Sequence, residues 1–203
     1  MTVQKIKGGA ELELIFIRHG QGEHTLSLPN SLNHPDPSLT QNGIEQAKML
    51  RKQFPLSEDD VLMISPIRRT LQTALIWSEG VRCQRIVTPL VSPRIFPQKK
   101  EWSSTLPCDV VLTKDMIRNE FTDFHMVEDL SLELWEKGIN TIPEKEFNSI
   151  AEMFLKRCRI LGKEKIYIVS HDGTITSYRQ FITGNELSRE DFPRETGWFT
   201  VVC

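Results

Sequence analysis

The chain has 203 residues, of which 39% are hydrophobic and 26% charged, and its formal net charge is −2. This length predicts a single domain over residues 1–203 with a sizeable core, and the balanced charge argues against nucleic acid or an acidic membrane surface as a partner. Because the sequence has no signal-peptide pattern, no run of ~20 apolar residues and four scattered cysteines, it predicts a cytoplasmic protein with reduced thiols.

A short apolar run near the N-terminus predicts the first strand. Residues 12–17 are rich in β-branched and aromatic side chains, and the run ends in Arg18-His19-Gly20. The glycine permits a sharp turn and the close approach of a ligand. The guanidinium can clamp phosphate or carboxylate oxygens, while the imidazole can act as a nucleophile or as an acid and base. At the carboxyl end of a strand, this tripeptide predicts an anion-binding position.

Two helices are predicted around a second strand. Residues 38–54 carry a partial apolar face at helical spacing. Residues 61–64 read as a buried strand, and a helix over residues 65–77 follows, with Ser65 as its N-cap and a proline in its first turn. Arg69 lies in that first turn, where a helix favours anions, and can reach back toward the same edge of the sheet.

The second half of the chain continues the alternation of strands and helices. Residues 92–112 are rich in proline, serine and lysine and predict a loop, and a loop of this length indicates a functional insertion or a lid. The alternation predicts an α/β protein: a three-layer α/β/α sandwich around a mainly parallel sheet. The remaining predicted elements are strands over residues 86–91, 165–169 and 199–202 and helices over residues 115–136 and 144–161.

A second histidine follows the predicted strand over residues 165–169, in the sequence Ser170-His171-Asp172-Gly173. Two histidines and two arginines therefore come from three separate strand ends. Core packing does not explain such a convergence, whereas an anion-binding site at one edge of the sheet does.

These motifs resemble those of the histidine phosphatase superfamily, which has the phosphoglycerate mutase-like fold. Residues 18–20 match its Arg-His-Gly nucleophile motif, and residues 36–47 match its D-x-x-L-T-x-x-G-x-x-Q-A segment. Residues 65–74 match S-P-L-x-R-A-x-Q-T-A with Arg69 on the arginine, and residues 169–171 match the motif around the second histidine. The four matches occur in the expected order along most of the chain.

The resemblance implies a phosphomonoester hydrolase that forms a phosphohistidine on His19 and uses no metal and no cofactor. It implies a small-molecule phosphoester as substrate. A protonated His171 would assist the two arginines in stabilising the transferred phosphoryl group. The residues expected to contact that group are Arg18, Arg69, His171, Gln21 and Thr25.

The sequence departs from the family pattern at three positions. Asp172 follows the second histidine where glycine is usual, and Thr25 stands where asparagine is common. Ser92 stands where the family has its acidic proton donor. Glu101, the nearest glutamate before a Pro-Cys-Asp stretch, is therefore the predicted donor, and Asp109 is the alternative.

Two other functions stay open. A phosphoglycerate-mutase-type phosphotransferase would use the same residues, but the chain is short for that branch and the loop for a bisphosphate primer is not recognisable. A non-catalytic phosphate-binding or regulatory protein would keep the pocket and lose the acid, which Ser92 permits.

His24 and His34 lack a standard metal-ligand spacing, so we expect loop or substrate contacts there. The sequence determines neither the physiological substrate nor the oligomeric state.

Overall fold

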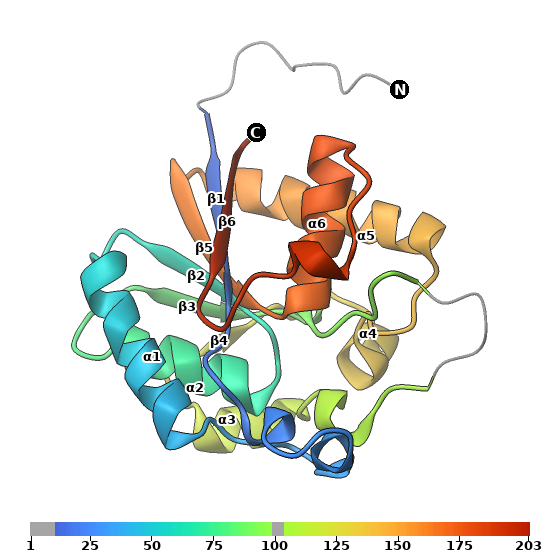
Figure 1. The fold of residues 1–203 in the computed structure, drawn as a ribbon. Helices are drawn as coiled ribbons and strands as arrows, with labels where there is room; N and C mark the ends of the chain where they lie inside the picture. Colours follow the sequence, from blue (N-terminus) through green and yellow to red (C-terminus); the bar gives the residue numbers. More distant parts are fainter. Residues whose placement is uncertain (1–10, 99–103) are drawn as a thin grey trace.

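The computed structural model describes residues 11–98 and 104–203 (Figure 1). Its six-stranded sheet has the order β4-β3-β2-β5-β1-β6. Neighbouring strands are parallel except for β6, which pairs with β1 in the antiparallel direction at one edge. The strands are β1 (Glu13–Arg18), β2 (Val61–Ile64), β3 (Gln84–Val87), β4 (His125–Met126), β5 (Lys165–Ser170) and β6 (Trp198–Val202).

Helices cover both faces of the sheet, with α1, α2 and α3 on one side and α5 and α6 on the other (Figure 1). Alternate side chains of β1 pack against the helices on opposite faces of the sheet. Ile15 and Ile17 pack with α1 and α2, whereas Leu14 and Phe16 pack with α5 and α6. The predicted three-layer α/β fold is therefore confirmed. The helices are α1 (Gln41–Gln53), α2 (Arg68–Trp77), α3 (Lys114–Glu120), α4 (Leu132–Lys137), α5 (Glu144–Ile160) and α6 (Asp172–Thr183).

An aromatic cluster holds α6 against the sheet. The ring of Tyr178 is fully buried and lies 5.4 Å from the Phe16 ring and 5.1 Å from the Phe147 ring, measured between centroids. The Tyr178 hydroxyl donates to the carbonyl of Leu90. Rigid packing of α6 also fixes the residue just before it, His171.

Two predicted helices differ most from the structure, while the helix predicted over residues 38–54 is observed as the shorter α1. The helix predicted over residues 115–136 is wrong, because the segment forms α3, the short strand β4 and then α4. The side chains of Phe121 and Phe124 are buried between α3 and β4, and their burial outweighs local helix propensity. The helix predicted to follow Ser65 begins only at Arg68, because the backbone of Ile67 is extended and Ile67, not Ser65, is its N-cap.

The strand predicted over residues 86–91 is also shifted. β3 ends at Val87, and Pro89 opens a single 3-10 turn instead of continuing the strand. Proline has no N–H for the sheet, which explains the stop. In contrast, α6 was not predicted at all, because its first five residues include a glycine and three β-branched residues, which form helices poorly in isolation.

The predicted loop over residues 92–112 is described at both of its ends. Arg94 is 4% exposed and pairs with Glu144 at 2.8 Å, so the first end is anchored to α5. The second end forms a 3-10 turn at Pro107–Asp109. The lid function of this segment stays a prediction, as does the single domain.

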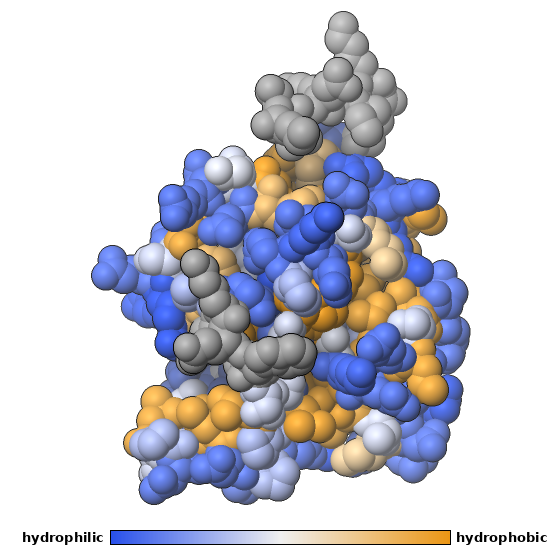
Figure 2. All heavy atoms as spheres, turned by 90° about the vertical axis from the view of Figure 1, so that its right-hand side faces the viewer, coloured by the Kyte–Doolittle hydropathy of each residue, from blue (hydrophilic) through white to orange (hydrophobic). Residues whose placement is uncertain are grey.

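The four cysteines form no disulfide bond and remain free thiols. Across residues 11–98 and 104–203, none of the helices combines the length and the apolar character that a membrane crossing requires. Figure 2 shows the face on the right of Figure 1, where hydrophobic side chains gather mainly in the lower part.

Candidate active site

The carboxyl ends of β1 and β5 bring two histidines together. β5 pairs with β1 along its whole length, and the His19 backbone N–H donates to the carbonyl of Ser170 at 3.0 Å. His171 follows directly. The two imidazole rings lie edge to face with centroids 5.1 Å apart, and the residues are only 2% and 4% exposed. The parallel register of the sheet thus confirms that the two predicted histidines meet.

Arg69, the second residue of α2, contacts both histidines. Its Nε donates to Nε2 of His19 at 3.1 Å, and its Nη2 lies 3.3 Å from Nδ1 of His171. The remaining guanidinium contacts go to the carbonyl of Cys108 at 2.7 Å and the carboxylate of Asp109 at 2.8 Å. A guanidinium that is 2% exposed needs such partners, because an unpaired buried charge is strongly destabilising.

The hydrogen bond of His19 to its own neighbour defines its tautomer. Nδ1 lies 2.6 Å from the carbonyl oxygen of Gly20, which can only accept, so Nδ1 carries the proton and Nε2 has the lone pair. Burial, followed by the charges of Arg69 and Arg18, lowers the pKa of His19 well below its ordinary value. The ring is therefore neutral at physiological pH, with a nucleophilic nitrogen beside Arg69.

His171 lies at the N-terminus of α6 and has a different pair of partners. Nδ1 accepts from Arg69, so Nε2 carries the proton and donates to Oγ of Ser65 at 2.8 Å. Burial and then the Arg69 charge hold the pKa of His171 well below its ordinary value. The protonated form that the resemblance implied would need additional negative charge close by. Ser65 itself was predicted as a helix cap, and its contact with His171 is the role that the structure assigns instead.

Arg18, the last residue of β1, contacts the first residue of α6. Its Nη2 forms an ion pair with Asp172 at 2.9 Å, and its Nη1 donates to the carbonyl of Pro193 at 2.9 Å. Asp172 is the residue that replaces the family's glycine. The sequence marked this position as unusual, but it did not reveal that the carboxylate meets the guanidinium of Arg18.

Close backbone packing positions the segment after β1. A Cβ atom on Gly20 would lie 2.5 Å from the carbonyl oxygen of Gly43, and one on Gly22 would lie 2.6 Å from Nδ1 of His24. Gly20 is therefore required sterically, because it meets backbone, whereas a side chain at position 22 would force the His24 side chain to shift. The imidazole of His24 lies beside His19, with ring centroids 5.6 Å apart.

Gln21 and Thr25 are not joined to the histidines by any hydrogen bond among the described residues. Oε1 of Gln21 accepts from Thr40 at the start of α1, at 2.8 Å. Oγ1 of Thr25 donates to the carbonyl of Gly22 at 2.9 Å. Their predicted phosphate contacts stay predictions.

Of the two candidate proton donors, Glu101 and Asp109, the structure describes only Asp109. Glu101 lies outside the described residues, whereas Asp109 borders the cluster through Arg69. Ser92 is fully buried, and its Oγ accepts from the backbone N–H of Ile139 at 2.9 Å, which is a structural role. In the part of the chain that the structure describes, no group of three His, Cys, Asp or Glu side chains is placed to hold a metal ion.

Two exposed apolar residues lie close in sequence to the turns near Asp109. The turn Asn30–Asn33 packs against the turn Pro107–Asp109. Beside these turns, Leu28 is 64% exposed and Val110 is 53% exposed. The surroundings of the cluster are thus partly apolar.

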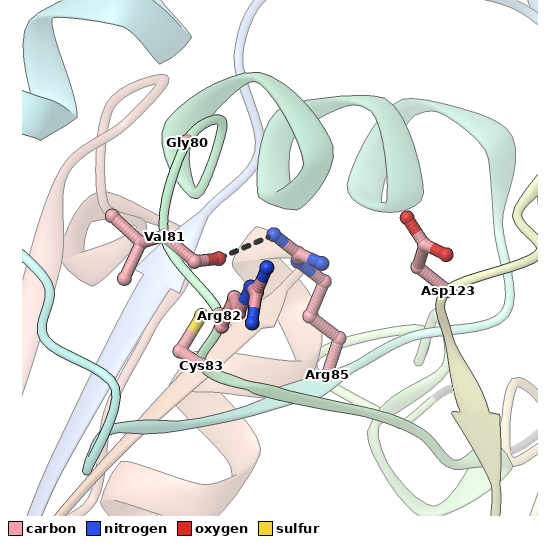
Figure 3. A pocket seen from close by; sticks show the side chains of 6 residues that line it. All are labelled: Gly80, Val81, Arg82, Cys83, Arg85 and Asp123. Atoms are coloured by element: carbon pink, nitrogen blue, oxygen red, sulfur yellow. Dashed lines mark hydrogen bonds between the residues drawn. The ribbon is translucent and has the colours of Figure 1, made fainter.

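Two of the cavities in the structure are informative about the location of the site. One of about 580 Å³ includes Arg18 in its lining. The other, of about 470 Å³, lies at the amino ends of β3 and β4, on the edge opposite the histidines (Figure 3). There Arg85 donates to the carbonyls of Val81 and Ser78 and closes the end of α2, so its charge is already engaged. The candidate site therefore remains at the carboxyl edge of the sheet.

Comparisons with known proteins give a family model and relatives that resemble this chain. The model of the histidine phosphatase superfamily (branch 1) matches residues 14–92. A probable phosphatase of Schizosaccharomyces pombe is 24% identical over 200 residues, which cover 92% of this chain and 86% of the relative. The match over residues 14–92 is to the same superfamily that the motifs of this chain resemble.

Solved structures share the fold. A putative α-ribazole-5′-P phosphatase of Escherichia coli superposes with a TM-score of 0.59 at 21% identity, covering 94% of this chain and 90% of the other. A phosphoserine phosphatase mutant of Entamoeba histolytica in complex with phosphoserine has a TM-score of 0.56 at 24% identity, with coverages of 93% and 89%.

Proposed function

We propose that this protein is a metal-independent phosphomonoester hydrolase that works through a phosphohistidine on His19. The observation that carries the proposal is the position of Arg69, which contacts the nucleophilic nitrogen of His19 and also His171. Core packing has no need of a buried arginine between two neutral histidines. The phosphatase names of the relatives support the same reaction.

The first step follows from the tautomer of His19. Nε2 attacks phosphorus, the N–P bond forms and the P–O bond to the leaving group breaks. The Nδ1–H bond to the Gly20 carbonyl orients the ring and stabilises the positive charge that develops on it. Water then attacks the phosphohistidine, which releases inorganic phosphate and restores the free imidazole.

Arginine charge stabilises the transferred group in this mechanism. Arg69 and Arg18 each hold a carboxylate, from Asp109 and Asp172 respectively. A phosphoryl dianion has more negative charge and more acceptor oxygens than a carboxylate. It can therefore replace the two carboxylates as the hydrogen-bond partner of the guanidinium groups. Placed between the two guanidinium groups and His171, its equatorial oxygens receive the positive charge that a metal ion supplies in other phosphotransfer enzymes.

The leaving alkoxide must receive a proton as the P–O bond breaks. Glu101 and Asp109 are the two candidate donors from the sequence. Asp109 already borders the cluster, and once a phosphoryl group takes its place on Arg69 its carboxyl group is free to face the leaving oxygen.

We further propose a small phosphoester as the substrate and the cytosol as the location. The solved relative from Entamoeba histolytica binds phosphoserine, which is a small phosphomonoester. The four free thiols fit a reducing compartment.

Trapping the intermediate tests the proposal. The protein is mixed with p-nitrophenyl phosphate, quenched in alkali to preserve phosphohistidine, and mapped by mass spectrometry. We expect phosphate on His19 and stoichiometric release of inorganic phosphate. Transfer of the phosphoryl group to a second hydroxyl of a phosphoglycerate would favour the mutase. Phosphate binding without any turnover would favour the non-catalytic protein that the buried Ser92 keeps open.

A further inference from the structure

His24 is a buried histidine that the mechanism above does not use. It lies in the 3-10 turn Glu23–Thr25, is 8% exposed, and packs its ring 5.6 Å from that of His19. Its Nδ1 is buried and has no hydrogen-bond partner among residues 11–98 and 104–203. Buried polar atoms are nearly always paired in native proteins, so an unpaired one beside an active site indicates a ligand.

The unpaired atom lies on the side of the turn that meets Arg69. A Cβ atom on Gly22 would lie 2.6 Å from Nδ1 of His24 and 3.2 Å from Cδ of Arg69. The Nδ1 edge of His24 and the stem of Arg69 therefore lie against the same glycine. The lack of a side chain at position 22 leaves this approach open.

The turn does not need the imidazole to hold its shape. Oγ of Ser31 donates to the His24 carbonyl at 2.7 Å, and the Thr25 N–H donates to the Gly22 carbonyl at 3.0 Å. The Glu23 N–H donates to the carbonyl of Ser38 at 2.9 Å. Backbone groups thus anchor the segment, and the ring is available for another role.

The charge around His24 suits an anion. Burial, followed by the charges of Arg69 and Arg18, lowers its pKa to about 3, so the ring is neutral at pH 7. A neutral imidazole keeps one N–H to donate. Among the described residues no guanidinium donates to Nδ1, and the guanidinium groups of Arg69 and Arg18 cannot accept a hydrogen bond, so an oxyanion is the partner that satisfies an N–H on Nδ1.

We propose that His24 is a phosphate-binding residue whose Nδ1–H donates to a non-bridging oxygen of the phosphoryl group held between His19, Arg69 and His171. The proposal rests on the proposed function for the place of that group. It can be tested without turnover, because inorganic phosphate offers the same oxygens.

Two substitutions separate hydrogen bonding from packing. His24→Asn keeps a donor near the position of Nδ1 but loses the ring, whereas His24→Phe keeps the ring and loses the donor. We expect phosphate affinity, measured by calorimetry, to fall about tenfold or more in His24→Phe and to stay within about threefold in His24→Asn. The exposed His34 receives the same two changes as a matched control, and thermal unfolding reports on folding.

The reverse order, with His24→Phe binding as the wild type and His24→Asn weakened, would assign His24 to packing and overturn the proposal. Equal effects of both substitutions, or no effect of either, would overturn it as well. NMR of protein with ¹⁵N-labelled histidine gives a check that is independent of the variants. Adding phosphate should shift the Nδ1 resonance of His24, and an unchanged resonance while those of His19 and His171 move would contradict the proposal.

The two proposals fail in different ways. Phosphate binding that depends on His24 in a protein without turnover would reject the hydrolase and keep the phosphate contact. Turnover through His19 with phosphate affinity unaffected by His24→Phe would keep the hydrolase and reject the contact.

Discussion

Nε of Arg69 donates a hydrogen bond to Nε2 of His19 across 3.1 Å. The arginine that would hold the phosphoryl group thus already touches the atom that would attack it. A phosphoryl group bound between them would take over both contacts, so the cluster needs little rearrangement for an in-line attack.

Replacing His19 by alanine should abolish turnover of p-nitrophenyl phosphate, because it removes the Nε2 lone pair that lies beside Arg69. The readout is kcat, compared with that of His34→Ala, which removes an exposed histidine. Circular dichroism checks that the variant folds. Substantial residual activity in folded His19→Ala would remove His19 from the nucleophile role.

Replacing Arg69 by lysine should lower kcat/KM by about 10²–10³, since an ammonium group keeps the charge but cannot bridge His19, His171 and a phosphoryl oxygen together. Arg68→Lys is the matched control. Arg68 is adjacent in the sequence, but it pairs with Asp36 and Glu120 outside the cluster. Near wild-type kcat/KM in Arg69→Lys would mean that Arg69 does not contact the transferred group.

The proton donor can be identified by changing the leaving group. Glu101→Gln and Asp109→Asn are compared on an alkyl phosphate and on p-nitrophenyl phosphate, whose leaving group needs little protonation. The variant that lacks the proton donor should hydrolyse the alkyl ester much more slowly than the wild type does, with a smaller loss of rate on the nitrophenyl ester.

Asp172→Asn serves as the control in this experiment, because its carboxylate pairs with Arg18. Equal losses on both esters indicate a binding role for the substituted residue. If neither Glu101→Gln nor Asp109→Asn discriminates between the esters, both assignments are wrong.

Acid should destabilise the protein through its buried histidines. Burial lowers the pKa of His24 from 6.5 to about 3, and it also lowers the pKa of His19 and His171. Below pH 6.5 the unfolded chain therefore binds more protons than the folded one, so stability is full above pH 6.5 and falls as pH decreases. The slope is at most about 1.4 kcal/mol per pH unit for each such histidine.

Urea unfolding between pH 7.5 and 4 measures this effect. The free energy of unfolding should depend less steeply on pH in His24→Phe than in the wild type, whereas in His34→Phe it should not. Identical slopes for His24→Phe and the wild type would show that His24 titrates alike in the folded and unfolded chains.

Local sequence patterns predicted the motif positions and all of the observed strands except β4. β2 was predicted at its observed bounds, and the helix predicted over residues 144–161 differs from α5 by one residue. Apolar runs, proline and glycine act within a few residues of the element that they specify, so one sequence is enough to locate such elements. The positions of His19 and His171 after parallel strands followed from the same signals.

Only the tertiary structure decided how the charges of the site are arranged. Arg69 meets Asp109 across 40 positions of sequence, and Arg18 meets Asp172 across most of the chain. The burial of His24 and the formation of α6 likewise depend on packing against distant segments. Such contacts depend on which loops the sheet order brings together and on the desolvation that follows, and no local pattern encodes either.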